Sequence, residues 1–295
     1  MGEAELTRAL VRPGGLWSRI KVVAETGSTN ADVAALARAG TPEGFVLIAE
    51  SQRAGRGRMG RPWQAPPATA LTMSVLLRPR SVAPSRLGWL PLLAGVAVVG
   101  ACAELPGLVP ALKWPNDLLT RATEPGPVAG GWGKCGGILA EAVEPDAVVV
   151  GIGINVSQDR EQLPPPPDPL AYPPTSLALA GVACEREQLA VQVLRGLSHW
   201  YGRWLAERGD PAGSGVLAAY RAHCATLGVQ VAAMLPDGVV LRGTATGVDV
   251  HGRLVVATDT HRRRLAAGDV HHIRAVSGAV DGPPVQPRVP LAPGH

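Results

Sequence analysis

Residues 50–63 read ESQRAGRGRMGRPW and hold four arginines and three glycines, directly after the apolar run FVLIA at residues 45–49. The apolar run predicts a strand that ends where a basic loop begins. Glycine lets backbone N–H groups approach a ligand closely, and each guanidinium offers a planar fork that matches a carboxylate or a phosphate. The stretch therefore predicts a cradle for anionic groups.

The residues of this loop alone also fit other interpretations. Runs of arginine also occur as solvated loops without a ligand and as basic patches for nucleic acid. The glycines at 55, 57 and 60 match the dinucleotide fingerprint G-x-G-x-x-G, but that motif must open a helix and Pro62 follows at once. The rest of the chain has to separate a ligand cradle from a nucleic-acid patch and from an unliganded loop.

Length and composition predict a globular protein with one large domain, or with a large and a small one. The chain has 295 residues, of which 46% are hydrophobic, and this is ample for a buried core. The apolar run at residues 87–103 contains glycine and proline and predicts a buried helix, and residues 1–15 show no secretory signal. The four cysteines lie more than thirty residues apart, which argues against zinc and disulfides and favours the cytoplasm.

The positive charge of the chain is local. The formal net charge is +4, and removing the four arginines of residues 50–63 would abolish it. A general coat of positive charge for nucleic acid is therefore absent from the sequence, and anionic small ligands are favoured.

Hydrophobic and turn patterns predict alternating strands and helices up to residue 227. An alanine-rich helix follows Ser28 or Thr29 as its N-cap and ends at Gly40. The basic loop joins two strands that we expect to be neighbours, and the long apolar helix should pack on their sheet. The expected strands are residues 19–26, 45–49, 70–77, 134–141 and 147–156, and the further expected helices are residues 84–105, 185–207 and 216–227.

Two glycine- or proline-containing stretches mark the ends of strands. In LKWPNDLL, residues 112–119, Pro115 interrupts a strand and the following Asn-Asp favours a turn, so Lys113 and Asp117 should flank a bend. In AVVVGIGINV, residues 147–156, Gly151 and Gly153 interrupt an apolar strand. Such glycines indicate the close approach of another group, here expected to be a flat ligand ring.

From residue 228 the pattern changes to short β runs with turn residues between them. Five short strands in under fifty residues predict a small barrel with its own core. We therefore divide the chain into residues 1–227, residues 228–277 and a Pro/Gly-rich tail, residues 278–295, that is expected to be disordered. The adjacent His271 and His272 do not predict a metal site, because neighbouring strand residues face opposite ways.

Five motifs together resemble those of the biotin protein ligases, also called biotin–acetyl-CoA-carboxylase ligases. They are GSTN at 27–30, SQRAGRGRMGRPW at 51–63, KWPNDLL at 113–119, KCGGILAE at 134–141 and GIGINV at 151–156, and their order and spacing cover residues 19–277. The resemblance implies an α/β catalytic domain, a mixed sheet flanked by helices, followed by an SH3-like barrel. It also implies an enzyme that makes biotinyl-5′-AMP from biotin and ATP and then transfers biotin to one lysine of a biotin carboxyl carrier domain.

The resemblance further implies roles for particular residues. Lys134, Arg56 and Arg58 would act in catalysis by supplying positive charge to the reacting anions, and Asp117 would organise Mg²⁺ on the leaving pyrophosphate. The nucleotide side would be formed by Arg61, Lys113, Asn116 and Asn155. The biotin side would be formed by Ser28, Thr29, Asn30, Gln52, Arg56, Gly57, Arg58, Lys134, Gly137, Gly151 and Gly153.

Two alternative functions remain, and the sequence differs from bifunctional members of the family in one respect. A lipoate-type acyl ligase on a related fold would accept a linear acid, but the polar Ser28, Thr29, Asn30 and Gln52 favour biotin. A non-catalytic nucleic-acid binder would be retained on DNA and would show no ATP–pyrophosphate exchange. Fewer than twenty residues precede the first expected strand, too few for the helix-turn-helix domain of bifunctional ligases, so neither DNA nor membrane is an expected partner.

Overall fold

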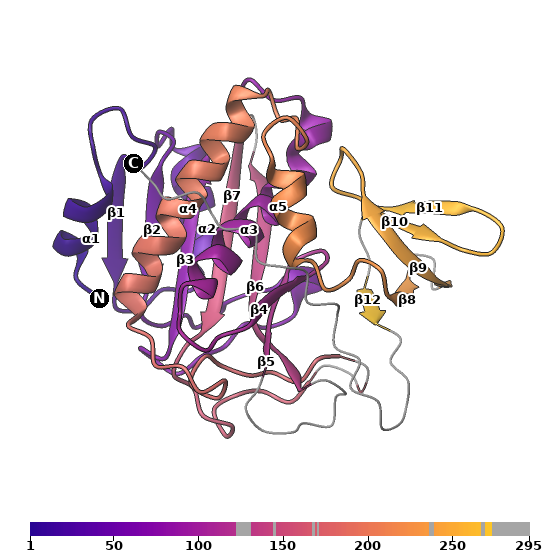
Figure 1. Cartoon of the computed structure of the whole chain (residues 1–295). Coiled ribbons are helices and arrows are strands. Elements are labelled where there is room, and N and C mark those ends of the chain that lie inside the picture. Colours follow the sequence, from indigo (N-terminus) through magenta and orange to yellow (C-terminus); the bar gives the residue numbers. More distant parts are fainter. Residues whose placement is uncertain are drawn as a thin grey trace.

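The computed structural model describes residues 1–121, 131–143, 146–166, 169, 171–235, 239–266 and 269–272. At its centre is a seven-stranded mixed sheet with the order β1-β2-β3-β7-β6-β5-β4 (Figure 1). Strands β1 and β2 pair in parallel, and the other neighbouring strands of this sheet pair antiparallel. The strands are β1 (Arg19–Val23), β2 (Phe45–Ala49), β3 (Ala70–Leu77), β4 (Pro110–Lys113), β5 (Asp117–Arg121), β6 (Trp132–Val143) and β7 (Ala147–Asn155).

The sheet separates two hydrophobic clusters, as strand β2 shows. Val46 and Ile48 belong to the larger cluster, with α3, whereas Phe45 and Leu47 belong to a smaller one under α2, because successive side chains of a strand face opposite ways. Helices α4 and α5 pack over α3, which is buried nearly all round (Figure 1). The helices are α1 (Glu3–Leu10), α2 (Thr29–Arg38), α3 (Leu90–Ala103), α4 (Arg186–Ala206) and α5 (Val216–His223), with short 3-10 helices η1 (Arg58–Gly60) and η2 (Pro84–Trp89).

The most apolar helical segment of the chain is a core element. Residues 84–103 are long and apolar enough to cross a membrane by composition, but most of this segment is buried inside the protein. Its apolar surface is covered by the sheet on one side and by α4 and α5 on the other. The prediction that the long apolar helix packs on the sheet is confirmed.

Strand predictions were accurate in the centre of the sheet and less accurate at element ends. Strands at residues 45–49 and 70–77 are confirmed, and they pair as antiparallel neighbours. The expected strand at 19–26 ends at Val23, and the strand expected to start at Lys134 starts at Trp132, which pairs with Arg121. The helix expected at 216–227 ends at His223, because the next residues bridge to Leu112.

Two further elements differ from the expectations. The helix expected at residues 84–105 is divided into η2 and α3. Helix α1 was not predicted, although Leu6 and Leu10 are spaced four residues apart and are both buried, which is the pattern of an amphipathic helix. The expected flexible connection at residues 121–132 and the expected disordered tail lie largely outside the described residues.

The C-terminal strands form a second, antiparallel sheet of the SH3-like type, but they do not enclose a core of their own. Val231, Ala245, Leu254 and Val256 belong to the same hydrophobic cluster as α3. Strands this short bury too little apolar surface by themselves, so their inner face needs the seven-stranded sheet and its helices as cover. The order is β11-β10-β9-β8-β12, with β8 (Gln230–Met234), β9 (Val240–Val248), β10 (Leu254–Ala257), β11 (Arg262–Leu265) and β12 (Asp269–His272).

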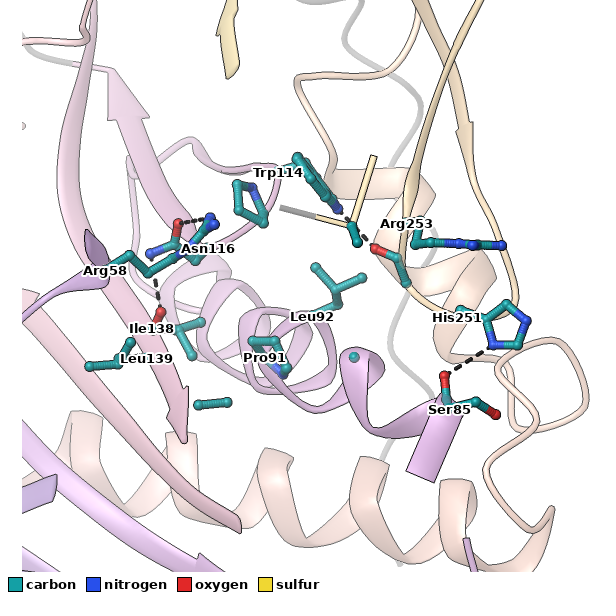
Figure 2. Close-up of a pocket in the computed structure, with 15 residues that line it drawn as sticks. Arg58, Ser85, Pro91, Leu92, Trp114, Asn116, Ile138, Leu139, His251 and Arg253 are labelled. Atoms are coloured by element: carbon teal, nitrogen blue, oxygen red, sulfur yellow. Dashed lines mark hydrogen bonds between the residues drawn. The ribbon is translucent and has the colours of Figure 1, made fainter. Parts of the chain in front are cut away.

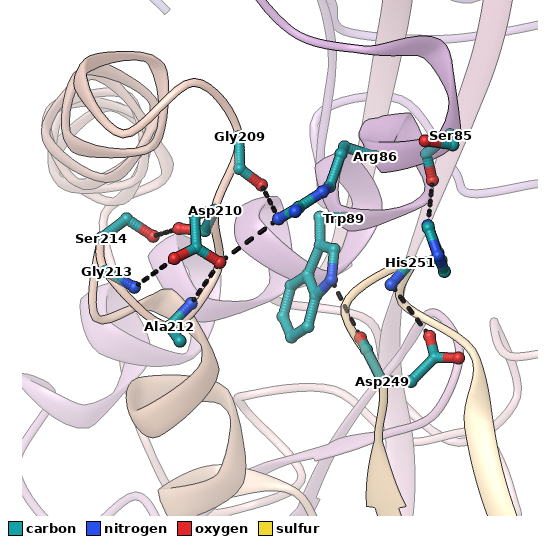
Figure 3. Close-up of polar contacts among 10 residues, drawn as sticks. All are labelled: Ser85, Arg86, Trp89, Gly209, Asp210, Ala212, Gly213, Ser214, Asp249 and His251. Carbon is teal, nitrogen blue, oxygen red and sulfur yellow. Dashed lines mark hydrogen bonds and ion pairs between the residues drawn. The ribbon is translucent and has the colours of Figure 1, made fainter.

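Two buried tryptophans of the larger part of the protein hold the turn between β9 and β10. Trp114 Nε1 donates to the Gly252 carbonyl at 3.0 Å (Figure 2), and Trp89 Nε1 donates to the Asp249 carbonyl at 3.1 Å (Figure 3). Both indoles are almost inaccessible to solvent, so each N–H would lose its partner if the turn moved away, at a cost of about 1–3 kcal/mol per buried group. The turn therefore fixes the position of the small sheet.

A substitution in this turn should weaken the fold by two separate effects. Gly252 has φ +79°, and a Cβ added there would lie 2.7 Å from the Gly88 carbonyl oxygen. We expect Gly252→Ala to lower the free energy of unfolding by about 2–4 kcal/mol, from backbone strain plus overpacking. Gly228→Ala is the matched control, because Gly228 has φ +83° and open space around its Cβ position. Equal losses for the two variants in urea unfolding would contradict the tight packing.

Candidate active site

One row of paired residues runs across the sheet and forms the floor of a cavity. Thr72 in β3 pairs with Gly153 in β7, Gly153 with Gly137 in β6, Gly137 with Asp117 in β5, and Asp117 with Lys113 in β4. Directly paired residues face the same side of a sheet, and the two glycines leave the middle of the row without side chains. The sheet is hollowed there, on the face that α2 covers, and the cavity above it has a volume of about 450 Å³.

The cavity brings together every residue that the sequence assigned to a site. They come from the start of α2, the basic loop, the turn between β4 and β5, and strands β6 and β7. The lining includes Ser28, Thr29, Asn30, Gln52, Arg56, Gly57, Arg58, Arg61, Lys113, Asn116, Asp117, Lys134, Gly137, Gly151, Gly153 and Asn155.

A β-bulge turns Lys134 into this cavity. Simple alternation along β6 would place Lys134 on the face opposite to Gly137, since their numbers differ by three. The pairing of β6 with β5 shifts by one residue between Leu118 and Leu119, so that Cys135 is the extra residue. A bulge of this kind redirects the side chains that precede it, and the Lys134 ammonium consequently lies 2.5 Å from Asp117 Oδ1.

Asp117 is held between two lysines. Its Oδ1 contacts Lys134 Nζ, and its Oδ2 lies 3.4 Å from Lys113 Nζ; the carboxylate side chain is 15% exposed. Burial opposes its ionisation, but the ammonium groups of Lys134 and Lys113 outweigh that effect and lower the pKa of Asp117. The carboxylate is therefore charged, and it fixes two cations at one edge of the cavity.

The expectation that Asp117 organises Mg²⁺ stays a prediction. Mg²⁺ needs oxygen ligands in an octahedral shell, whereas both oxygens of Asp117 face ammonium groups. In the part of the chain that the structure describes, no three His, Cys, Asp or Glu side chains gather in a way that could hold a metal ion. Mg²⁺ is commonly held by one or two carboxylates together with the phosphates of a substrate, so a Mg²⁺ ion that enters with a nucleotide does not need such a cluster, and we assign no step to it.

The start of α2 is tied to the basic loop. Ser28 is the N-cap, as predicted, and its hydroxyl accepts from the Ala31 N–H at 3.5 Å. Gln52 Oε1 accepts from the Thr29 N–H at 2.7 Å and from the Thr29 hydroxyl at 3.0 Å. Two of the expected biotin-side residues, Thr29 and Gln52, are thus hydrogen-bonded to each other.

Asn30 is oriented by residues that the sequence did not single out. The Ser74 hydroxyl donates to Asn30 Oδ1 at 2.6 Å, and Asn30 Nδ2 donates to Glu141 Oε2 at 2.5 Å and to the Leu139 carbonyl at 3.3 Å. Thr72 and Ser74 alternate with apolar residues in ALTMSVLL, and this alternation was the available signal for a polar face of β3. Glu141 gave no comparable signal.

The glycines of β7 do permit a close approach, but the approaching groups belong to the protein. A Cβ on Gly153 would lie 2.6 Å from the indole ring of Trp63, and a Cβ on Gly151 would clash with the amide of Asn30. The expected flat ring over Gly153 is therefore Trp63, the last residue of the basic loop. Its Nε1 is buried and has no hydrogen-bond partner among the described residues.

The basic loop folds back on itself over the cavity. Arg56 bridges to Pro62, the Gly57 N–H donates to the Arg61 carbonyl at 2.7 Å, and Arg58 Nη1 donates to Asn116 Oδ1 at 3.3 Å across to the β4–β5 turn. Among the described lining residues, five side chains are cationic and one, Asp117, is anionic. The cavity is thus suited to ligands that carry several negative charges.

Among the arginines of the basic loop, Arg53 points away from the cavity and pairs with Glu25 at 3.2 Å on the exposed surface. One expected site residue, Asn155, contributes less than the others. Asn155 lines the cavity, but its amide donates to the Thr175 carbonyl at 2.9 Å and accepts from Gln158 Nε2 at 3.1 Å. Its contacts with the protein explain its position without a nucleotide.

Known proteins share both parts of this architecture. Residues 23–159 match the Biotin/lipoate A/B protein ligase family, and residues 226–272 match the Biotin protein ligase C terminal domain. A biotin--[acetyl-CoA-carboxylase] ligase of Mycobacterium tuberculosis is 41% identical over 259 residues, which cover 86% of this chain and 89% of that protein. This chain belongs to the biotin protein ligase family.

Further relatives of this ligase agree with that placement. The Bifunctional ligase/repressor BirA of Bacillus subtilis is 32% identical over 236 residues, which cover 78% of this chain and 67% of that protein. A solved structure, the biotin protein ligase from Aquifex aeolicus in complex with biotin and ATP, superposes with a TM-score of 0.68 at 24% identity and covers 88% of this chain and all of that one. This last likeness shows that the fold is shared.

The charge on Asp117 should make the stability of the ligase depend on acidic pH. Because the pKa of Asp117 is lowered on folding, its charged form stabilises the fold above the unfolded-state pKa, and this stabilisation is lost as the pH falls through the folded-state pKa. We expect Asp117→Asn to be less stable than the wild type at pH 7 and the difference to shrink below about pH 4. Thermal unfolding of both proteins between pH 3 and 8 measures this difference in stability. A difference that does not change with pH would contradict the ion pairs of Asp117 with the two lysines.

Proposed function

We propose that the cavity binds biotin and ATP together and that the ligase joins them as biotinyl-5′-AMP. The observation that carries this proposal is the gathering of five cationic side chains over a glycine floor. A carboxylate oxygen of biotin would attack the α-phosphorus of ATP, and the bond to the β-phosphate would break and release pyrophosphate. Both reactants are anions, so fixed positive charge is needed to bring them together and to stabilise the charge that develops on phosphorus.

We assign the two ends of the cavity to the two substrates. The end at α2 carries the polar groups of Thr29, Asn30 and Gln52, which suit the ureido ring of biotin better than the chain of a linear acid. The other end carries Lys113 and Asn116 beside Arg61 from the loop, and we assign it to the nucleotide. Lys134 lies between these ends, where the carboxylate and the α-phosphate would meet.

The second step would transfer biotin to a protein. The lone pair of a lysine ε-amine would attack the acyl carbon of the adenylate, the bond to AMP would break, and an amide and one proton would be formed. The Mycobacterium tuberculosis relative is named for acetyl-CoA carboxylase, so we propose the biotin carboxyl carrier domain of such a carboxylase as the acceptor. All four cysteines are free thiols, which is consistent with a reaction in the cytoplasm.

Biotin-dependent exchange of pyrophosphate into ATP tests the first step directly. We expect exchange with biotin and little with lipoate or octanoate. Lys134→Ala should lower the exchange rate on the order of 10²-fold, as for the loss of one preorganised electrostatic group. Lys21→Ala, an exposed lysine on β1, is the control and should leave the rate unchanged. Exchange at the wild-type rate in Lys134→Ala would remove Lys134 from the reaction centre.

Arg58 should matter more for holding the adenylate than for making it. Its guanidinium reaches over the cavity to Asn116, while Arg56 and Lys134 remain to supply charge to the reaction. Losing one charge-assisted contact of about 1.5–3 kcal/mol should raise escape of the adenylate by roughly 10- to 150-fold. Arg58→Gly should therefore still consume biotin and ATP but label added albumin on many lysines.

The control for this experiment lies in the same loop. Arg53→Gly removes an arginine that pairs with Glu25 outside the cavity, so it should label the carrier domain alone, like the wild type. Mass spectrometry of albumin after the reaction measures the labelling. An Arg58→Gly variant that is inactive, or active and still selective, would show that another residue retains the adenylate.

A further inference from the structure

Glu141 lies outside the active-site cavity but on the same face of β6 as two residues that line it. Gly137 and Leu139 belong to the lining, and Glu141 does not. These positions are two residues apart, and this part of β6 pairs with β7 without a bulge, so all three face the same side of the sheet. The Glu141 side chain is exposed, and it reaches the cavity wall from outside.

A chain of short polar contacts connects Glu141 with the end of the cavity that we assign to biotin. Asn30 Nδ2 donates to Glu141 Oε2 at 2.5 Å. The Ser74 hydroxyl oxygen lies 2.6 Å from Asn30 Oδ1 and 2.7 Å from Thr29 Oγ1. Thr29 Oγ1 in turn lies 3.0 Å from Gln52 Oε1. Thr29, Asn30 and Gln52 line the cavity, so the chain runs from the protein surface into the binding wall.

The outer end of this chain fixes the direction of its hydrogen bonds. A carboxylate and a backbone carbonyl have only acceptor atoms. Glu141 and the Leu139 carbonyl, which accepts at 3.3 Å, therefore require the NH2 group of Asn30 on their side. Asn30 Oδ1 then faces Ser74 and accepts its hydroxyl proton. Because a hydroxyl has one proton, Ser74 has none left to donate to Thr29.

This direction keeps acceptor atoms available to a ligand. Thr29 Oγ1 receives no proton from Ser74, so both of its lone pairs are free, and its own proton is shared between Ser74 at 2.7 Å and Gln52 Oε1 at 3.0 Å. With the Asn30 amide turned round, Asn30 would donate to Ser74 and Ser74 to Thr29. One lone pair of Thr29 would then be occupied, and the Thr29 proton would go to Gln52 alone.

Asn30 is packed so that it can turn round but cannot move away. Its amide lies against the backbone of β7, where a Cβ on Gly151 would be 2.2 Å from Asn30 Oδ1. Asn30 is 8% exposed, and Ser74 is inaccessible to solvent. Because the two ends of an amide have nearly the same shape, a half-turn of the Asn30 side chain fits this space. Loss of Glu141 would therefore change the direction of the chain and leave its position unchanged.

We propose that Glu141 is a positioning residue that determines the specificity of the cavity for a ring with N–H donors. The inference rests on the proposed function, in which the ureido ring of biotin occupies this end of the cavity. A ureido group has two N–H donors and one carbonyl acceptor, and a buried N–H without an acceptor costs free energy. Glu141 keeps the acceptors of Thr29 and Gln52 available to these donors without touching the ring.

Three substitutions of Glu141 test this direction, with biotin-dependent ATP–pyrophosphate exchange as the assay. Glu141→Gln still offers an acceptor oxygen to Asn30, so the KM for biotin should stay within about threefold of wild type. Glu141→Ala lets the amide turn and should raise this KM about tenfold. Glu141→Lys offers only donors, so it should turn the amide round and raise the KM about thirtyfold or more.

The kinetic pattern separates positioning from chemistry and from folding. In all three variants kcat and the KM for ATP should stay within about twofold of wild type, because the lost interaction is the same in the ground state and in the transition state. The midpoint of thermal unfolding should stay within about 3 °C of wild type, since Glu141 is exposed. If Glu141→Lys lowers the midpoint further, the ratio of KM between the Ala and Gln variants decides alone.

The matched control is Glu104→Lys, which makes the same change of charge at the exposed C-cap of α3. It should leave the KM for biotin unchanged. An unchanged KM in both Glu141→Ala and Glu141→Lys would overturn the proposal, and so would equal increases in all three variants or a fall in kcat. Wild-type protein without biotin-dependent exchange would instead refute the proposed ligase function, so the two failures are distinguishable.

Discussion

The one-residue bulge at Cys135 determines what the cavity can do, because it sets the face to which Lys134 points. In an unbroken ladder the lysine would point into the α3 side of the sheet, where an ammonium group among apolar side chains would be very costly. With the bulge, the ammonium meets Asp117 above the glycine floor. The carboxylate in turn holds Lys113, so one backbone irregularity places two cations beside the arginines of the loop.

The floor depends on a second constraint, the absence of side chains at Gly137 and Gly153. These glycines pair with each other in the middle of the sheet, where a larger residue would fill the cavity or displace Trp63. Apolar residues such as Val149 continue the same face of β7 into the core under α2. The strand is therefore a packing element at one end and a binding surface at the other.

Much of the fold and of the candidate site could be predicted from the sequence, because these features depend on local patterns. Two strands of five and eight residues, the N-cap at Ser28, the bend between Lys113 and Asp117, and the set of cavity residues follow from composition, turn chemistry and resemblance. The rest depends on pairing between distant strands. Register decided the bulge, the contact of Asp117 with Lys134, and the shared core of the small sheet, and no single strand encodes its register with a partner.

The central claim is that Lys134 stands where two anionic substrates meet. A crystal structure of the protein with biotin and a non-hydrolysable ATP analogue tests this claim most directly. The account predicts the biotin ring beside Thr29 and Asn30, the nucleotide beside Asn116, and Lys134 Nζ within hydrogen-bond distance of both the biotin carboxylate and the α-phosphate. A structure in which Lys134 remains paired with Asp117 and contacts neither ligand, or in which either ligand lies outside this cavity, would contradict it.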